Sequence, residues 1–286
     1  MSEIKWLDEL FHTYRPAPTY PTYPPYHTGL YLEDYFYQHY KDHTHDLKRR
    51  YLPIFWTTCY IENKTHGLQN LINSLPAEEK YFTVSQHDDA IKETINIDLI
   101  NFGAGGNKRT LKTYAIPLVC SEIPKRYIRT NPKDILASFV GSNTHPIRNT
   151  ISNMFRGDDR IAVISNQWSP SVDEDSLNRF CEISSRSRFM LCPRGYGLNS
   201  FRLYESFQLG CVPVILTDEP YLPWADELDW SKFSITILDS QFDQLIDILT
   251  EISESTYREM IHEGQKAYQS HFTLDAVCHN IIKRLR

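Results

Sequence analysis

The sequence predicts an α/β fold of two domains, each built around a parallel sheet. In the second half of the chain, short apolar runs that suit buried strands alternate with helical segments, which is typical of a parallel sheet. A similar strand-helix-strand pattern occupies about residues 51–86. A chain of 286 residues can form two domains with separate cores. An Asn-Pro pair near Thr130–Lys133 separates the two patterns, so we expect the domains to cover residues 1–133 and 134–286.

The first domain opens with a segment rich in tyrosine and proline. Residues 14–28 hold too much proline for a helix or a central strand, and they suit an extended polyproline-like strap. A helix is expected from about Leu30, because Leu32, Phe36 and Tyr40 recur at helical spacing. The remaining expected elements are strands over 51–58 and 79–86, a helix over 66–75, short strands within 90–133 and a flexible loop over 103–109.

The second domain begins with a strand and a helix and ends with three helices. In chain order, the expected strands are 135–141, 161–165, 189–192, 212–216 and 234–238, and the expected helices are 147–155, 201–209, 241–253, 255–269 and 273–285. Gly210 follows the second of these helices directly, at the position where a glycine commonly ends a helix.

Composition and charge exclude several classes of protein. Hydrophobic residues at 41% and charged residues at 23% are typical of a soluble globular protein. A net charge of −6 argues against a nucleic-acid binder, which needs a basic face. The six cysteines form no Cys-x-x-Cys pair, so we expect buried free thiols in a reducing compartment and no zinc site. No signal peptide or membrane-length apolar run is visible, which favours a cytoplasmic location.

The stretch 189–216 carries the strongest functional signal in the chain. Its loop, PRGYGLNS, contains two glycines and ends in Ser200, which we expect to cap the following helix. Such a loop lets backbone amides approach an anion, and the helix dipole favours negative charge there. Arg194 and Arg202 add positive charge on either side of the loop. The stretch therefore predicts a diphosphate site.

Glu205 lies three residues beyond Arg202, on the same face of the predicted helix. A carboxylate at this distance from a bound diphosphate could reach ribose hydroxyls. The alternative is an ordinary α/β unit with a solvent-facing Arg–Glu pair, which is a common arrangement. The two glycines and the flanking arginines favour the binding site.

Residues Phe189–Ile235 closely resemble the C-terminal signature of the exostosin glycosyltransferases. That signature runs from a strand through CPRG, an S-x-R-x-x-E segment and GCVPV to an LP segment followed by DW-x-x-F, and this chain matches it almost without gaps. Weaker similarities in the same order occur at 135–148, 82–89 and 114–122, so the resemblance spans roughly residues 50–240.

The resemblance implies a GT-B arrangement, in which two Rossmann-like domains enclose a central cleft. It also implies an inverting, metal-independent glycosyltransferase that needs no cofactor and uses a nucleoside diphosphate sugar, most simply a UDP-sugar, as co-substrate. Domain 134–286 would bind the nucleotide and domain 1–133 the glycan acceptor. Among the family's donors we favour xylose or galactose. We expect a small soluble microbial or viral member.

The expected donor site combines the loop, its helix and the stretch GSNTHPIR. His145 and Arg148 follow a predicted strand there, and the planar guanidinium of Arg148 could bind phosphate oxygens. A surface arginine at a turn is the alternative. The expected donor-binding residues are Arg148, Arg194, Gly195, Tyr196, Asn199, Ser200, Phe201, Arg202 and Glu205.

Inverting transfer needs a base that removes the proton of the acceptor hydroxyl. Asp88 is our first candidate, His87 the second and Glu33 a distant third; the first two directly follow a predicted strand of the first domain. Alternatively, Asp88 caps a following helix. The family often has an aromatic residue where this chain has Asp89. Metal binding by this acidic cluster is not expected.

Two other functions stay open at this point. One is a GT-B glycosyltransferase that uses a GDP-sugar, such as a fucosyltransferase. The other is a non-catalytic glycan- or nucleotide-binding protein with the same fold. The intact set of Arg194, Arg202 and Glu205 argues against the second.

Overall fold

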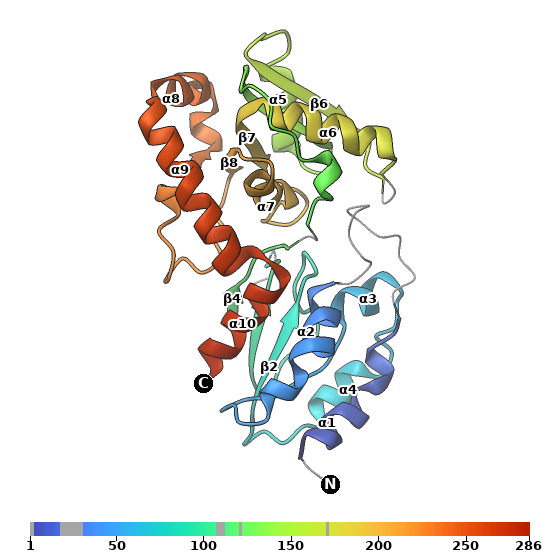
Figure 1. Cartoon of the computed structure of the whole chain (residues 1–286). Helices are drawn as coiled ribbons and strands as arrows, with labels where there is room; N and C mark the ends of the chain where they lie inside the picture. Colours follow the sequence, from blue (N-terminus) through green and yellow to red (C-terminus); the bar gives the residue numbers. More distant parts are fainter. Residues whose placement is uncertain (1–2, 18–30, 107–111, 120–121, 170–171) are drawn as a thin grey trace. The chain divides into compact units, whose positions relative to one another are not determined.

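The computed structural model describes residues 3–17, 31–106, 112–119, 122–169 and 172–286, which divide into two compact units. Among these residues, unit 1 contains those up to Pro117 together with Leu274–Arg286, and unit 2 contains Leu118–Thr273. Each unit has helices and a wholly parallel sheet (Figure 1). The predicted fold class, α/β with two Rossmann-like domains, is confirmed. The predicted strap over 14–28 lies mostly outside the described residues, as does part of the loop over 103–109.

The sheet of unit 1 has the order β1-β2-β3-β4, and β2 and β3 pair along their whole length. Its strands are β1 (Arg50–Tyr51), β2 (Lys80–Ser85), β3 (Asp98–Gly103) and β4 (Thr113–Ala115), and its helices are α1 (Glu3–Leu10), α2 (Leu32–Tyr40), α3 (Trp56–Ile61), α4 (Leu68–Asn73) and α10 (Leu274–Leu285). Large shielded side chains, among them Phe11, Trp56 and Tyr81, fill the core between helices and sheet. Short 3-10 turns occur at His12–Tyr14 and Lys41–Thr44.

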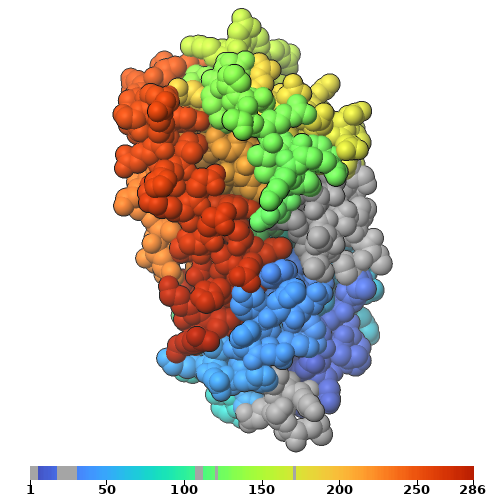
Figure 2. All heavy atoms as spheres, in the orientation of Figure 1, coloured from blue at the N-terminus to red at the C-terminus, as the bar shows by residue number. Residues whose placement is uncertain are grey.

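Helix α10 joins unit 1 although most of that unit lies far earlier in the sequence. Figures 1 and 2 show α10 (red) beside α2 (blue). The Tyr40 hydroxyl of α2 donates a hydrogen bond to Asp275 Oδ1 at 2.6 Å, and the Arg284 guanidinium lies 5.3 Å from the centre of the Tyr114 ring. Val277 and Ile281 are fully shielded from solvent. The helix therefore completes the core of unit 1.

The predicted strand over 51–58 is wrong beyond its first residue. Strand β1 ends at Tyr51, and the Leu52 amide makes one more ladder bond, to the Phe82 carbonyl at 2.8 Å. Pro53 follows and has no N–H to continue the ladder. The chain then turns into α3, where Trp56 is fully buried and donates its Nε1–H to Thr83 Oγ1 at 2.9 Å. An apolar run alone does not distinguish a buried strand from a buried helix.

The sheet of unit 2 has the order β6-β5-β7-β8-β9. Its strands are β5 (Ile135–Ser142), β6 (Ile161–Asn166), β7 (Ser187–Pro193), β8 (Val212–Thr217) and β9 (Ile235–Leu238), and its helices are α5 (Pro146–Met154), α6 (Glu174–Arg186), α7 (Phe201–Gln208), α8 (Leu245–Glu251) and α9 (Glu254–Ala267). Shorter turns occur at Lys125–Tyr127, Trp230–Lys232, Asp239–Gln244 and Tyr268–Phe272. Gly210 follows α7 with a φ of +65°, a conformation that favours glycine, so the predicted helix end is confirmed.

The division of the chain differs from the expected boundary at 133. The segment before β5 packs within unit 2, because the Ile123 amide donates to Gln208 Oε1 at 2.6 Å and the Tyr127 hydroxyl donates to Glu174 Oε1 at 2.7 Å. The continuous part of unit 2 therefore begins at Leu118, and α10 belongs to unit 1. The boundary between the two units thus lies before the expected boundary of 1–133 and 134–286, and the last helix belongs to the first unit and not to the second.

The strand order of unit 2 reverses between β5 and β7. The chain leaves β5 for β6 on one side and then crosses to β7 on the other. In open parallel sheets, ligands bind outside the carboxyl ends of the strands at such a switch point. The loops after β5 and β7 therefore mark the expected ligand crevice of this unit.

Candidate functional site

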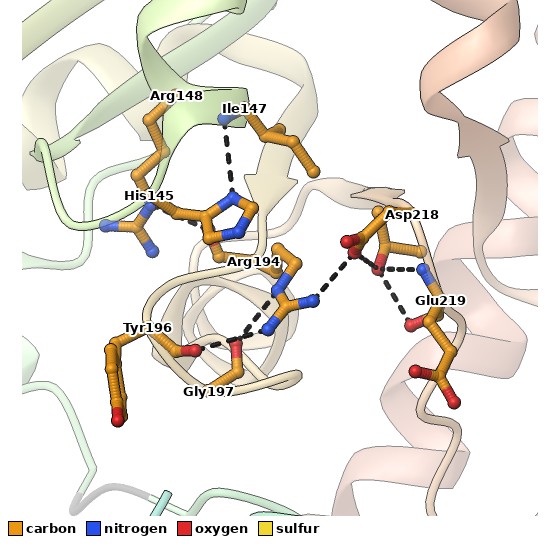
Figure 3. A network of polar contacts seen from close by, with 9 residues as sticks. His145, Ile147, Arg148, Arg194, Tyr196, Gly197, Asp218 and Glu219 are labelled. Atoms are coloured by element: carbon orange, nitrogen blue, oxygen red, sulfur yellow. Dashed lines mark hydrogen bonds and ion pairs between the residues drawn. The ribbon is translucent and has the colours of Figure 1, made fainter. Parts of the chain in front are cut away.

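Three of the predicted donor residues, Arg148, Arg194 and Tyr196, lie near the carboxyl ends of β5 and β7 in unit 2 (Figure 3). Arg148 lies in the first turn of α5, and its buried guanidinium donates to three backbone carbonyls: those of Ser142 at 2.7 Å, Pro193 at 3.1 Å and Arg194 at 3.0 Å. Because these carbonyls end the two strands on either side of the switch point, Arg148 ties the strand ends together. It is not a surface arginine at a turn.

Gly195 follows Arg194 in the loop after β7, and it must be small. A Cβ at this position would lie 3.2 Å from an Arg148 guanidinium nitrogen and 3.3 Å from Thr144 Oγ1, tighter than ordinary contacts. The glycine therefore lets the loop after β7 approach the loop after β5. Whether this loop also binds a diphosphate stays a prediction.

Arg194 lies beside this glycine and is mostly shielded by its own loop. Its guanidinium donates to the carbonyls of Tyr196 at 3.2 Å and Gly197 at 3.3 Å, and to Asp218 Oδ1 at 2.7 Å. Asp218 follows β8, and sequence reasoning did not select it. Its only sequence signal is an acidic residue at the end of a buried strand.

His145 caps the N-terminus of α5 in this group of residues. Its Nδ1 accepts a hydrogen bond from the Ile147 amide at 3.3 Å, so the proton of the neutral ring sits on Nε2. Burial lowers the pKa of His145, the positive charges of Arg194 and Arg148 lower it further, and Asp218 opposes them. The ring is therefore a neutral hydrogen-bond donor at pH 7.

The end of the loop is held by Asn199 and not by Ser200. Asn199 Oδ1 accepts hydrogen bonds from the Ser200 amide at 3.0 Å and the Tyr204 hydroxyl at 3.1 Å. Ser200 occupies the N-cap position of α7, but its side chain makes no capping hydrogen bond, so that prediction is wrong in detail. Tyr196 at the loop tip is 58% exposed, and Phe201 begins α7 half-buried.

Arg202 and Glu205 form an ion pair inside unit 2, and the solvent-facing alternative is wrong. Glu205 is 1% exposed, and Arg202 donates to its carboxylate. The same guanidinium donates from Nε to the Val140 carbonyl of β5 at 2.7 Å and lies 4.1 Å from the centre of the Phe180 ring. The Arg202 guanidinium thus lies just below the end of β5 with its charge offset by Glu205, and the roles of the pair toward phosphate and ribose stay predictions.

The predicted base candidates belong to unit 1, at the carboxyl end of β2. The backbone of His87 and Asp88 packs against Gly105, where a Cβ would lie 2.3 Å from the His87 carbonyl oxygen. Residues 88–97 form turns and loop, so the alternative in which Asp88 caps a helix is wrong. Asp89 is buried and pairs with Lys92 at 3.4 Å.

His87 is a weak base in this setting. Burial, and to a smaller extent the charge of Lys92, lower its pKa to about 4, although Asp89 opposes them. Its Nδ1 accepts a hydrogen bond from the Asp89 amide at 3.2 Å. The ring is neutral at pH 7, and its affinity for a proton is no greater than that of an ordinary carboxylate.

Glu33, the third candidate, is fully buried beside this segment. Its Oε1 accepts hydrogen bonds from the Gln86 amide at 2.7 Å and the Thr57 hydroxyl at 2.8 Å, while the Leu32 amide donates to Gln86 Oε1 at 2.7 Å. Within the described chain, Glu33 Oε2 and Asp34 Oδ2 have no hydrogen-bond partner. Burial raises the pKa of Glu33 to about 8 and that of Asp34 to about 7.

This buried carboxyl predicts a pH dependence of stability. The pKa of Glu33 rises from 4.5 to about 8 on folding, so its contribution to stability is complete below pH 4.5 and is lost as the pH rises through 8. Glu33→Gln should therefore remove this contribution, which changes the unfolding free energy by on the order of a few kcal/mol between pH 5 and 8. The melting temperature of the variant should accordingly fall less over this range than that of the wild type. Glu78→Gln, at an exposed position of the same unit, is the control. Parallel pH profiles of wild type and Glu33→Gln would contradict the prediction.

The described cysteines match the expectation of free thiols. Cys59, Cys181, Cys192, Cys211 and Cys278 are all free and buried, and Cys120 lies outside the described residues. Burial raises the pKa of each of these thiols. Across the described ranges, no group of three or more His, Cys, Asp or Glu side chains is placed to hold a metal ion. None of the described helices is long and apolar enough to cross a membrane.

The model of the exostosin GT47 domain family matches residues 25–252, which is most of the chain. The chain belongs to the exostosin GT47 family. The match includes the loops after β5, β7 and β8, so it covers the whole donor-side group of unit 2. The predicted family is thereby confirmed.

Curated relatives of this exostosin-family chain come from plants and an animal. It is 30% identical over 140 residues to a probable glycosyltransferase of Arabidopsis thaliana, covering 49% of this chain and 28% of the relative. It is 28% identical over 144 residues to an exostosin-1 homolog of Caenorhabditis elegans (46% and 37%), and 35% identical over 81 residues to the probable beta-1,4-xylosyltransferase IRX10 of Arabidopsis thaliana (28% and 20%).

The aligned parts cover about a quarter to just over a third of the first two relatives. Among solved structures, a sucrose-phosphate synthase from Thermosynechococcus elongatus is 8% identical with a TM-score of 0.43, over 88% of this chain and 76% of that one.

Proposed function

We propose that this exostosin-family chain is an inverting glycosyltransferase that transfers a sugar from a UDP-sugar to a glycan. The observation that carries the proposal is the group of basic side chains at the switch point of unit 2. Arg194 and the neutral His145 lie at the loops after β7 and β5, and Arg148 and Arg202 add charge just behind the strand ends. A diphosphate is the group that such a crevice suits.

The chemistry assigned to unit 2 is support of the leaving group. When the bond between the sugar and the diphosphate breaks, negative charge grows on the distal phosphate. Fixed guanidinium groups and backbone amides stabilise that charge without reorganising, because the protein already holds them in place. Arg148 contributes by fixing the loop, since its own donors are directed to backbone carbonyls.

The chemistry assigned to unit 1 is removal of the acceptor proton. Asp88 is the proposed base, because its side chain is half-buried at the carboxyl end of β2, whereas Glu33 is fully buried. The carboxylate would take the proton of the attacking hydroxyl as its oxygen bonds to the anomeric carbon. The proposed proton transfer to Asp88 needs no metal ion.

The proposed donor sugar is xylose or galactose. Support for xylose comes from the similarity to IRX10, which is named a probable beta-1,4-xylosyltransferase. A glycan is the proposed acceptor, as glycan synthesis is the general activity of the family.

A thermal-shift screen tests the donor class. UDP should raise the melting temperature, by an amount that grows with its concentration, and EDTA should leave the rise unchanged. Addition of UDP-xylose, UDP-galactose and other UDP-sugars should then rank the donors. Stronger stabilisation by GDP than by UDP would contradict the UDP assignment. No shift with UDP, GDP or CMP from a folded sample would favour a glycan-binding protein that keeps only the fold.

A further inference from the structure

Asp218 is a carboxylate in a place where a diphosphate site should disfavour one. It lies directly after β8, and its Oδ1 accepts a hydrogen bond from Arg194 at 2.7 Å. The Asp218 side chain is 45% exposed, whereas that of Arg194 is 11% exposed. Negative charge beside a bound diphosphate costs energy through repulsion. The position of Asp218 therefore needs a reason other than phosphate binding.

The backbone holds Asp218 in place independently of Arg194. Thr217 Oγ1 accepts a hydrogen bond from the Glu219 amide at 3.1 Å and donates one to the Glu219 carbonyl at 2.8 Å. This tight turn fixes the end of β8 and carries Asp218 at its tip. Figure 3 shows the carboxylate turned toward Arg194, with the His145 ring nearby.

The carboxylate is ionised and accepts hydrogen bonds only. Burial acts to raise its pKa, but the hydrogen bond and charge of Arg194 outweigh that effect and hold the pKa below its usual value. Both Arg194 and the more distant Thr217 hydroxyl approach Oδ1. An ionised carboxylate can accept several hydrogen bonds, so Oδ2 is suited to a ligand that donates.

We propose that Asp218 recognises the donor sugar, with Oδ2 accepting a sugar hydroxyl while Oδ1 stays hydrogen-bonded to Arg194. The inference rests on the proposed function, because the sugar of a nucleoside diphosphate sugar is attached to that phosphate. Hydroxyls of the first sugar carbons therefore lie next to whatever group binds it. The Arg194–Asp218 pair would contact phosphate with its positive half and sugar with its negative half.

The competing explanation is that Asp218 only positions Arg194. The two explanations differ in which ligand loses affinity. A positioning residue affects UDP and UDP-sugar equally, because both carry the phosphate that Arg194 binds. A residue that contacts the sugar affects the UDP-sugar alone.

The test measures binding of UDP and of UDP-xylose or UDP-galactose by titration calorimetry. Asp218→Asn should weaken UDP-sugar binding about tenfold, as expected for a lost hydrogen bond to a charged group, while UDP binds as before or more tightly. Arg194→Met should weaken both ligands. Asp158→Asn removes an exposed Asp–Arg pair at the opposite end of the sheet, and it should change neither.

Each outcome decides the proposal. An equal loss for UDP and UDP-sugar in Asp218→Asn would reduce Asp218 to positioning Arg194, and unchanged affinity for both would remove it from the site. If Asp218→Asn failed to fold, Asp218→Ser would carry the same comparison at this half-exposed position. Wild-type protein that binds no UDP would instead refute the proposed function itself, which is a different result.

Discussion

Asp88→Asn should nearly abolish sugar transfer while leaving UDP binding unchanged. Asparagine has nearly the same shape as aspartate but does not accept a proton at neutral pH, and a positioned base contributes about 10²- to 10⁴-fold to the rate. The loss should appear in kcat, measured as UDP release with the best donor and acceptor. UDP should still raise the melting temperature of the variant, because the donor group lies in unit 2 and Asp88 in unit 1.

Two variants complete this experiment. Asp46→Asn, at an exposed position of unit 1, is the matched control and should keep full activity. His87→Gln should retain most of the activity, because Asp88 is the proposed base. Full activity in Asp88→Asn together with a large loss in His87→Gln would transfer the base assignment to His87.

Glu205→Ala should destabilise unit 2 strongly. It leaves the Arg202 guanidinium in the interior without its negative partner, and breaking a buried ion pair in this way typically costs about 3–5 kcal/mol. Urea unfolding followed by circular dichroism measures the loss. Glu254→Ala removes an exposed carboxylate that pairs with Arg188 and Arg258, so it should change the stability far less.

A double variant separates the charge from the packing. Arg202→Met with Glu205→Leu removes both charges and should recover much of the lost stability. Failure to recover would show that the hydrogen bond from Arg202 to the Val140 carbonyl matters more than the pairing. For the ribose prediction, Glu205→Gln is the gentler change, and weaker binding of UDP with unchanged binding of pyrophosphate would support it.

Local sequence signals predicted the elements around the donor group closely. From β7 to β8 the chain forms a strand, a loop, a helix and a strand in the predicted order. Proline and glycine mark the loop, and Gly210 marks the helix end. The same reasoning failed at 51–58, where one apolar run contains a strand end, a proline and the start of a helix. Hydrophobicity reports burial there and not the backbone conformation.

The site residues that sequence reasoning missed or assigned differently depend on distant partners. Arg148 was expected to bind phosphate, but its donors reach carbonyls of two strands that are separated in the sequence. Asp218 carries no special local pattern, and its importance comes only from its contact with Arg194. Ser200 has the right residue type for a cap, yet neighbouring Asn199 holds the loop end. Such facts follow from the tertiary fold and not from spacing along the chain.

The membership of α10 in unit 1 has a consequence for biosynthesis. A ribosome makes all of unit 2 before it makes the helix that covers α2, so unit 1 waits with part of its apolar surface unprotected. The usual expectation, in which the N-terminal domain folds first during translation, therefore does not apply simply here. Unit 1 can close only once α10 has been made. This nascent intermediate is the species in which chaperone binding or aggregation would compete with folding.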